Sequence, residues 1–528
     1  MDTWNLGDLF EAVADAVSDR EAVVSGDQRF SYATLDERAN RLAHVFVAHG
    51  VEPGDGVALV MRNGHEYIEA MLAAFKVRAV PINVNTRYTT DELHYLLDDA
   101  QPRLVLVEQD LRDRVEAALV QVGTMARTIT RGPEYEAALA ASDHRRPALM
   151  RSGDDQYVLY TGGTTGLPKG VVWRHEDLLF GALGGGNPGG DPVSQPHEVV
   201  DVARTGRTRC LPASPFTHGT AQWAALSTLL RGGTVIVDTG LTFDAARLWT
   251  LAEREAAAIL VIVGDSFARP LVDALHSEPD RWDLGELLVV LSGGAILSPA
   301  VRSELLDHLP WTVVVDGYGT SETGGQGQMP TWAGQVPGAL PRFHVDEDTA
   351  VLDDAGRPAP PGSGLIGRLA HKGHIPLGYH RDPAASAETF TVLHGQRWAV
   401  PGDLARVEAD GSVTLLGRGA SSINSGGEKV FPEEVELVIK CYPGVFDVVV
   451  IGTPDDRFGE RVAAVIEPRP GIVLDLQALE SHVREHIADF KVPRRVVLVD
   501  QLQRRPTGKA DLVWARAQVA TVEPTAPG

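Results

Sequence analysis

The feature that most constrains the fold is a loop rich in glycine and threonine in the first third of the chain. Its residues are Tyr160-Thr161-Gly162-Gly163-Thr164-Thr165-Gly166-Leu167-Pro168-Lys169-Gly170. Apolar segments flank it at 156–160 and 171–173, so we expect two short strands joined by this loop. Glycines let backbone N–H groups point into one concavity, threonine hydroxyls add donors, and the lysine adds a positive charge. The composition predicts a polyphosphate site, although a lone glycine-rich turn is more often only a flexible hairpin.

Two commoner phosphate-binding motifs do not fit this chain. The Walker loop needs Gly-Lys followed by Ser or Thr, and here the order is Pro168-Lys169-Gly170. The dinucleotide fingerprint needs a third glycine that opens a helix, whereas Gly317-Tyr318-Gly319 continues toward Glu322. The nucleotide site therefore belongs to another class.

Length and composition indicate a multidomain enzyme. A chain of 528 residues exceeds one ordinary core, so about two or three domains are expected. The net charge of −23 argues against nucleic acid as a partner, and an anionic nucleotide must be held by a local positive cluster. Only Cys210 and Cys441 occur, which excludes a disulfide framework. No targeting segment or long apolar run is seen, so we expect a cytoplasmic protein without a membrane span.

Strands alternate with helices over most of the chain. An apolar strand at 57–61, a helix at 66–77 and a strand at 79–82 predict a parallel sheet covered on both faces. The N-terminal residues 6–18 predict an amphipathic helix. Residues 182–206, rich in Gly, Pro and Asp, are interpreted as a mobile surface loop.

A second glycine-rich segment follows the strand predicted at 313–316. Glycine-rich loops at the ends of strands are where open α/β sheets bind ligands. Tyr318 can stack on a base, Ser321 can bond a phosphate oxygen, and Glu322 can bind Mg²⁺. For the earlier glycine-containing segment Ser292–Ala295, which follows a buried strand, the alternative is a plain strand-to-loop turn.

These motifs together resemble those of the adenylate-forming enzymes, which include acyl-CoA synthetases, luciferases and peptide-synthetase adenylation domains. The phosphate loop departs from the family pattern only at Gly162, where Ser is usual, and the second motif only at Ser321, where Thr is usual. Near the C-terminus, Pro506-Thr507-Gly508-Lys509 matches the catalytic Pro-x-Gly-Lys segment. The likeness covers nearly the whole chain and is greatest to actinobacterial acyl-CoA ligases for bulky, steroid- or terpenoid-like acids.

The resemblance implies an α/β fold in two domains. Residues 1–419 would form a large N-terminal adenylation domain of stacked βαβ layers plus a β-barrel-like part. Residues 420–528 would form a small mobile α+β domain that carries the catalytic lysine. Ala420 would be the hinge, and it departs from the charged residue that many relatives have there.

The resemblance also assigns the nucleotide site. Lys509 and Glu322 would be catalytic, with Mg²⁺ held by Glu322 and Thr161. The phosphates of ATP would contact Thr161, Gly162, Gly163, Thr164, Thr165, Gly166 and Lys169. Adenine and AMP would contact Gly293, Gly294, Ala295, Asp316, Gly317, Tyr318, Gly319 and Ser321. The ribose would contact Asp403 and Arg418, although an Asp after Gly at a turn is ordinarily structural.

The acyl and coenzyme A sites are assigned in the same way. His218 and Trp223 would line the acyl pocket, with a plain core role as the alternative, and the glycines at Gly264, Gly317 and Gly324 would leave room for a bulky acyl group. Gly426-Gly427-Glu428 matches the loop that meets coenzyme A.

The implied reaction is ATP-dependent activation of a bulky carboxylic acid as an acyl-adenylate, followed by thioester formation with coenzyme A. One alternative is an enzyme with weak CoA transfer that hands its adenylate to an acyl-accepting partner protein. Another is a stand-alone amino-acid or aryl-acid adenylating enzyme. The sequence does not fix the oligomeric state, and a homodimer is left open.

Overall fold

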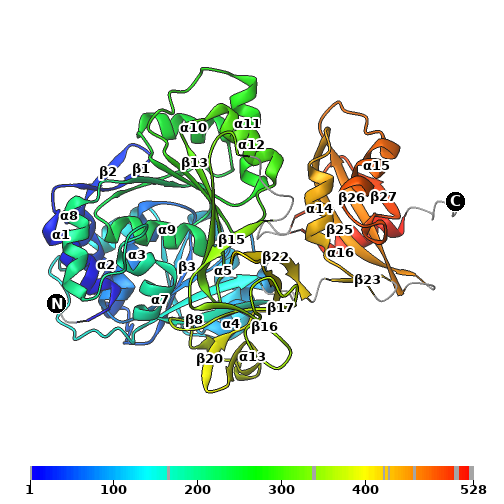
Figure 1. The fold of residues 1–528 in the computed structure, drawn as a ribbon. Coiled ribbons are helices and arrows are strands. Elements are labelled where there is room, and N and C mark those ends of the chain that lie inside the picture. The colour runs from blue at the N-terminus through cyan, green and yellow to red at the C-terminus, as the bar shows by residue number, and fades with distance from the viewer. Residues whose placement is uncertain are drawn as a thin grey trace.

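The computed structural model describes residues 3–162, 167–335, 341–419, 422–425, 428–455, 459–504 and 510–521, apart from the side chains of Arg418 and Lys429. We refer to the described residues up to 419 as the large domain and to those from 422 as the small domain. Figure 1 shows the large domain as two sheets with helices packed on them and the small domain beside it. The predicted boundary falls at Ala420, which lies outside the described residues, so it stays a prediction.

The first sheet of the large domain confirms the parallel arrangement predicted from the alternating pattern. Strands β4, β3, β5 and β6 are parallel, and the antiparallel pair β7 and β8 extends them. In spatial order the described strands are β18 (Gly378–Tyr379), β8 (Pro168–Arg174), β7 (Gln156–Gly162), β4 (Val80–Asn83), β3 (Gly56–Val60), β5 (Leu104–Val107) and β6 (Arg127–Thr130).

The second sheet changes from parallel to antiparallel along its length. Its parallel part contains β1 (Glu21–Ser25), β10 (Thr234–Val237), β9 (Arg209–Pro212), β11 (Ile259–Ile262), β12 (Val289–Gly293) and β13 (Val313–Thr320), with β2 (Gln28–Ser31) antiparallel at the edge. Its antiparallel part contains β14 (Gly324–Thr331), β15 (Arg342–Val345), β22 (Val413–Arg418), β21 (Asp403–Val407), β17 (Ile366–His371), β16 (Thr349–Leu352), β20 (Gln396–Ala399) and β19 (Phe390–Leu393).

Amphipathic helices supply the apolar layer against which the sheets pack. Phe10, Phe46, Phe75 and Trp173 are fully buried in the largest core, to which the N-terminal helices contribute. The α-helices of the large domain are α1 (Leu6–Ala16), α2 (Tyr32–Ala48), α3 (His65–Lys76), α4 (Thr90–Ala100), α5 (Arg112–Val122), α6 (Pro133–Ala140), α7 (His175–Ala182), α8 (Val199–Thr205), α9 (Gly219–Leu230), α10 (Ala245–Arg254), α11 (Asp265–Ser277), α12 (Pro299–His308) and α13 (Pro383–Thr389). Short 3₁₀ turns are η1 (Gln109–Leu111), η2 (Gly184–Gly186) and η3 (Pro196–Glu198).

The prediction of a surface loop over residues 182–206 is wrong at its end. Residues 199–205 form helix α8, and Val199 and Ala203, one turn apart, are both fully buried. An apolar pair at this spacing packs one helix face on the core, and this contact outweighs the turn-forming composition of the residues before it.

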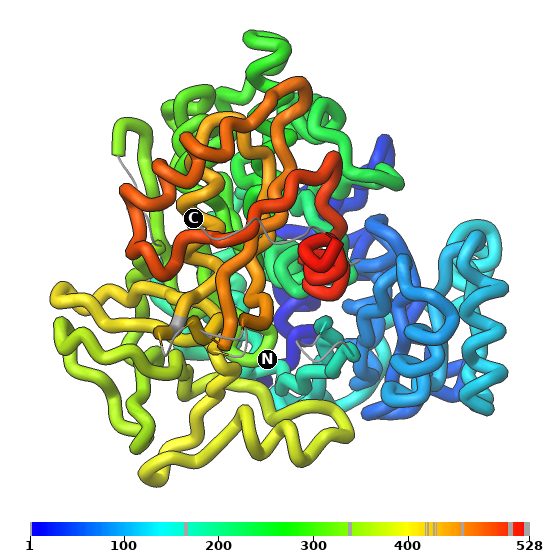
Figure 2. Tube along the Cα trace, turned by 90° about the vertical axis from the view of Figure 1, so that its right-hand side faces the viewer, coloured from blue at the N-terminus to red at the C-terminus, as the bar shows by residue number. Residues whose placement is uncertain are grey.

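The small domain is built on a separate sheet. Its described strands are β24 (Glu428–Val430), β23 (Ile423–Ser425), β26 (Gly459–Pro468), β25 (Val445–Asp455) and β27 (Arg495–Leu498). Around them lie α14 (Pro432–Lys440), α15 (Leu476–His486), α16 (Leu512–Ala520) and the turn η5 (Asp489–Lys491). Figure 2, which is rotated by 90° about the vertical axis relative to Figure 1, shows this domain in orange to red in front of the large domain.

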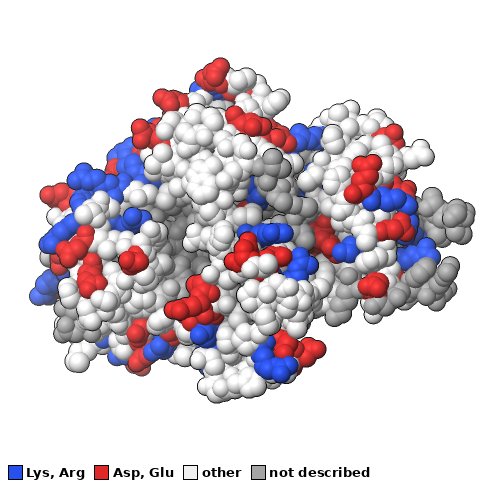
Figure 3. Space-filling model, viewed as in Figure 1, with Lys and Arg blue, Asp and Glu red and all other residues white. Residues whose placement is uncertain are grey.

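Charge and hydropathy add two observations. On the face shown in Figure 3, acidic and basic side chains are interspersed over both domains. Among the described residues, no helix combines the length and the apolar character that crossing a membrane would require.

Candidate active site

The predicted nucleotide-binding residues lie at the carboxyl ends of two adjacent parallel strands. The register of β12 and β13 pairs Ser292 with Asp316 and Gly293 with Gly317. The next strand, β14, is antiparallel to β13, and a bulge interrupts their register between Tyr318 and Gly319. Bulges turn side chains away from the regular alternation and are frequent beside active sites. The sheet therefore changes direction where a ligand is expected to bind.

The residues predicted to bind adenine and ribose are in direct contact. The Tyr318 hydroxyl donates to Asp403 Oδ2 at 2.9 Å, and the Tyr318 ring lies 5.5 Å from that of Phe343. Asp403 is buried and starts β21, where its backbone is paired with that of Arg418 on β22. In such a pair the tyrosine ring can stack on the base of a nucleoside, and the carboxylate can accept hydrogen bonds from its ribose hydroxyls.

Asp316, predicted to contact adenine, is held in a buried ion pair. Arg302 of α12 contacts its carboxylate and also donates to the Leu297 carbonyl at 3.0 Å. Burial raises the pKa of Asp316 to about 6, although Arg302 opposes this rise. The pair joins the middle of β13 to α12, and Arg302 continues the contact to the loop after β12. Asp316 therefore has a structural contact in addition to its predicted role.

The predicted metal ligand and the predicted phosphate-binding lysine lie on the two sides of Tyr379. The Tyr379 hydroxyl donates to Glu322 Oε1 at 2.9 Å, and Lys169 Nζ lies 5.0 Å from the centre of the Tyr379 ring. Lys169 also pairs with Asp382 Oδ2 at 3.2 Å. Sequence reasoning passed over Tyr379, which follows a glycine at the end of the segment 367–379, and only its place in β18 next to β8 reveals it.

The phosphate loop and the catalytic segment are described only at their ends. Thr161 and Gly162 end β7, and the register pairs Thr161 with Lys169 across the hairpin. Gly163, Thr164, Thr165, Gly166 and Lys509 lie outside the described residues, as do Ala420, Gly426 and Gly427. Glu428 is exposed at the start of β24.

Trp223, one of the candidate acyl-pocket residues, forms an aromatic pair with Trp173. Trp173 Nε1 donates to the Ser321 carbonyl at 3.0 Å, and the Trp223 ring meets that of Trp173 edge-on at 6.3 Å. His218 directly precedes α9, which carries Trp223. Trp173 thus fixes the backbone beside Glu322. The sequence did not reveal this contact, although Trp173 ends the strand predicted at 171–173.

The three glycines assigned to the acyl pocket differ in their surroundings. Gly264 and Gly324 have φ values of +57° and +72°, and an added Cβ would meet the carbonyls of Ile296 and Gly181 at 2.4 and 2.1 Å. Close backbone approach therefore requires glycine at both positions. At Gly317 the nearest atom to an added Cβ is 3.7 Å away, so this position has room. Their role in the acyl pocket stays a prediction.

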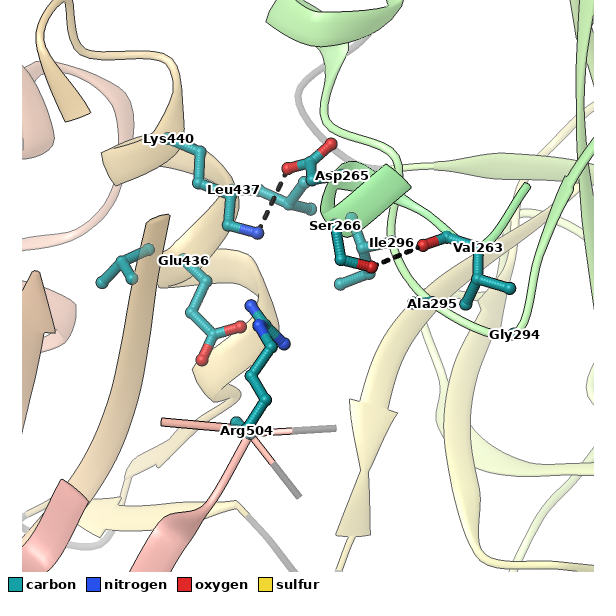
Figure 4. A pocket seen from close by; sticks show the side chains of 12 residues that line it. Val263, Asp265, Ser266, Gly294, Ala295, Ile296, Glu436, Leu437, Lys440 and Arg504 are labelled. Atoms are coloured by element: carbon teal, nitrogen blue, oxygen red, sulfur yellow. Dashed lines mark hydrogen bonds and ion pairs between the residues drawn. The ribbon is translucent and has the colours of Figure 1, made fainter. Parts of the chain in front are cut away.

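A cavity of about 230 Å³ lies between the large domain and the small domain (Figure 4). The large domain lines it with residues on both sides of α11's start and with the loop after β12. The small domain contributes side chains of α14 and the residues that flank the Lys509 segment. The lining residues are Val263, Asp265, Ser266, Gly294, Ala295, Ile296, Glu436, Leu437, Lys440, Val448, Arg504 and Ala510.

Comparisons with known proteins agree with this arrangement. The AMP-binding enzyme family matches residues 10–380, and the AMP-binding enzyme C-terminal domain matches residues 434–509. The chain belongs to the AMP-binding enzyme family.

Individual relatives extend the match over nearly the whole chain. It is 44% identical to 3-oxocholest-4-en-26-oate–CoA ligase of Rhodococcus rhodochrous, over 97% of this chain and 96% of that protein. It is 43% identical to a medium/long-chain-fatty-acid–CoA/3-oxocholest-4-en-26-oate–CoA ligase of Mycobacterium tuberculosis, with the same coverage. The crystal structure of ATP-bound MatB from Rhodopseudomonas palustris matches with a TM-score of 0.82 and 29% identity, over 98% of this chain and 99% of that one.

Proposed function

We propose that this chain is an AMP-forming acyl-CoA ligase for a bulky, steroid-like carboxylic acid. The observation that carries the proposal is the 44% identity, over 97% of the chain, to a ligase named for 3-oxocholest-4-en-26-oate. Two sets of contacts support the proposal, because ATP needs nucleoside, metal and phosphate ligands in one site. Tyr318 contacts Asp403, and Glu322 and Lys169 both contact Tyr379. We assign the reaction to the cytoplasm, where ATP and coenzyme A are both available.

In the first step, a carboxylate oxygen of the acid attacks the α-phosphorus of ATP. The bond from that phosphorus to the β-bridging oxygen breaks, and pyrophosphate leaves. Negative charge spreads over the phosphate oxygens, so positive groups placed in advance lower the barrier. Lys169 would hold the outer phosphates, and Lys509 would lie between the carboxylate and the α-phosphate.

A magnesium ion would enter with the nucleotide. Tyr379 engages one oxygen of Glu322, which orients the carboxylate, and the second oxygen suits a hard cation. Magnesium prefers oxygen ligands and usually combines one or two protein oxygens with substrate phosphates and water. Glu322 and the Thr161 hydroxyl would supply such protein oxygens.

In the second step, the sulfur of coenzyme A attacks the acyl carbonyl carbon. The bond between that carbon and the AMP oxygen breaks, AMP leaves, and the thiol proton passes to solvent. The described end of the candidate coenzyme A loop is Glu428. The relatives' names favour this complete ligase over an enzyme with weak CoA transfer and over an amino-acid or aryl-acid adenylating enzyme.

The test is a product analysis with purified protein, MgATP and a panel of acids from acetate to polycyclic acids, with and without coenzyme A. We expect CoA-dependent AMP release and a thioester, most rapidly with a polycyclic side-chain acid. Faster turnover of acetate than of polycyclic acids would contradict the substrate class. Adenylate accumulating without thioester would instead indicate an acyl-accepting partner protein, and size-exclusion chromatography of the same sample would report a homodimer.

Lys509→Ala tests the catalytic assignment. We expect adenylate formation, measured by pyrophosphate exchange, to fall by roughly 10²–10³, the usual effect of losing one preorganised electrostatic group. Lys372→Ala is the matched control, since Lys372 pairs with Asp348 at 3.5 Å in the antiparallel part of the large domain. Exchange at the wild-type rate in Lys509→Ala would remove this lysine from the mechanism.

A further inference from the structure

Four charged side chains of alternating sign connect the loop after β12 with the base of the Lys509 segment. They are Asp265, Lys440, Asp447 and Arg504, and we call them the charge relay. Lys440 Nζ lies 3.1 Å from Asp265 Oδ2 in the large domain and 3.1 Å from Asp447 Oδ1 in its own domain. Asp447 Oδ2 accepts from Arg504 Nε at 3.2 Å. Figure 4 shows Lys440 reaching across the cavity to Asp265.

The large-domain end of the relay fixes a loop of the nucleotide site. Asp265 Oδ1 accepts from the Ser298 backbone N–H at 2.8 Å, and the Asp265 N–H donates to the Ile296 carbonyl at 3.0 Å. Both contacts lie directly after Gly294 and Ala295, the residues predicted to border adenine. The position of Asp265 is therefore linked to the shape of that loop.

The small-domain end holds the base of the catalytic segment. Arg504 and Ala510, which flank the Lys509 segment in the sequence, form an isolated antiparallel bridge. Ala510 directly follows Lys509 in the sequence. Because Asp447 binds Arg504, the relay reaches the described residues on both sides of the Lys509 segment.

The charged side chains of the relay are largely buried, which distinguishes them from an exposed surface ion pair. The side chains of Lys440 and Asp265 are each 10% exposed, and that of Asp447 is 13% exposed. A buried charge is tolerated only when it is paired, and removing one partner leaves the other uncompensated. Burial lowers the pKa of Lys440, but Asp265 and Asp447 raise it by more, so the cation is retained.

We propose that Asp265 and Lys440 are positioning residues for adenylate formation: they dock the small domain so that Lys509 meets the nucleotide. The proposal rests on the proposed function. Neither residue touches the reacting atoms. Their effect should fall on the step that needs Lys509 and spare the step that consumes an adenylate already made.

A second ion pair between the domains supplies a matched control. Arg469 lies 3.4 Å from Glu304 and 3.9 Å from Asp273, and these three side chains are 34%, 40% and 47% exposed. Exposed ion pairs contribute little. Arg469 also lies outside the charge relay and has no contact with the loop at 294–298 among the described interactions.

The experiment measures the two half-reactions separately in Asp265→Asn, Lys440→Met, the double variant and Arg469→Gln. We expect pyrophosphate exchange to fall by roughly 10–100-fold in Asp265→Asn and Lys440→Met, the scale for truncating a buried charged pair at an interface. Thioester formation from chemically prepared acyl-adenylate and coenzyme A should stay within about twofold of the wild type. Both single variants remove the Asp265–Lys440 contact, so the fold-loss of the double variant should be smaller than the product of the two single fold-losses.

Asp265→Asn keeps the proposal testable if Lys440→Met fails to fold, since it leaves the Lys440–Asp447 pair intact within the small domain. Wild-type exchange in Asp265→Asn, or equal losses in both half-reactions, would overturn the positioning role. A loss in Arg469→Gln equal to that in Asp265→Asn would also overturn it. A wild-type protein that forms no adenylate with any acid would instead defeat the proposed function.

Discussion

Replacing Asp316 by asparagine tests how the buried ion pair behind the nucleotide site is balanced. Burial raises the pKa of Asp316 from its ordinary value of 3.8 to about 6, even with Arg302 in contact. A carboxyl group with a raised folded-state pKa is protonated in both states at low pH. As the pH rises above 3.8, the unfolded chain ionises first, so the folded state loses stability until the pH passes about 6.

The size of this loss follows from the shift. Each unit of pKa difference corresponds to about 1.4 kcal/mol, so the wild type should lose about 3 kcal/mol in all, of which about 2 kcal/mol falls between roughly pH 4.5 and 7.5. Asparagine has the shape of the neutral acid and does not ionise. The difference in the free energy of unfolding between Asp316→Asn and the wild type should therefore shift by about 2 kcal/mol in favour of the variant as the pH rises over that range.

Arg302→Met should show the opposite trend. Without the guanidinium the pKa of Asp316 rises further, so the loss of stability continues above pH 6. The deficit relative to the wild type should reach about 2 kcal/mol near pH 7.5. The assay is urea unfolding at a series of pH values, followed by tryptophan fluorescence. A flat difference between Asp316→Asn and the wild type, or one that shrinks as the pH rises, would refute the reasoning, because it would mean that Arg302 holds this pKa down.

Three further changes test contacts within the site. Tyr379→Phe removes a hydrogen bond to the Glu322 carboxylate, worth about 1.5–3 kcal/mol for a charged acceptor. We therefore expect the Mg²⁺ concentration for half-maximal pyrophosphate exchange to rise by roughly 10–150-fold, and an unchanged Mg²⁺ dependence would exclude orientation of Glu322 by Tyr379. Trp173→Phe loses the bond to the Ser321 carbonyl, worth about 1 kcal/mol, and kcat/KM for ATP should fall about 3–10-fold; a loss confined to the acid's KM would assign Trp173 to the acyl pocket instead. Burial raises the pKa of Glu436 to about 8 despite Lys440, so the folded state opposes ionisation of this carboxyl group. Glu436→Gln should therefore be more stable than the wild type from about pH 5 upward, by a margin that grows to pH 8. Thermal unfolding at pH 5 and pH 8 measures this margin, and an equal margin at both pH values would count against the reasoning.

A nucleotide site could be predicted from the sequence because its candidate residues are adjacent along the chain. Tyr318 and Glu322 belong to one segment, and the glycine-rich composition of that segment and of the phosphate loop is visible without structure. The parallel sheet around 57–82 was equally accessible, since the period of apolar residues reports which faces are buried. Helix α8 was missed because the burial of Val199 and Ala203 depends on a distant surface.

By itself the sequence determined the family and the order of its motifs, and it predicted residue types that suit phosphate and metal binding. Only the tertiary structure decided the partners of those residues. Tyr379 reaches Glu322 through β18, Arg302 reaches Asp316 from α12, and Lys440 reaches Asp265 from another domain. Hydrogen bonds and ion pairs act over about 3 Å in space, whereas these partners are separated along the chain by a distance that no local pattern records.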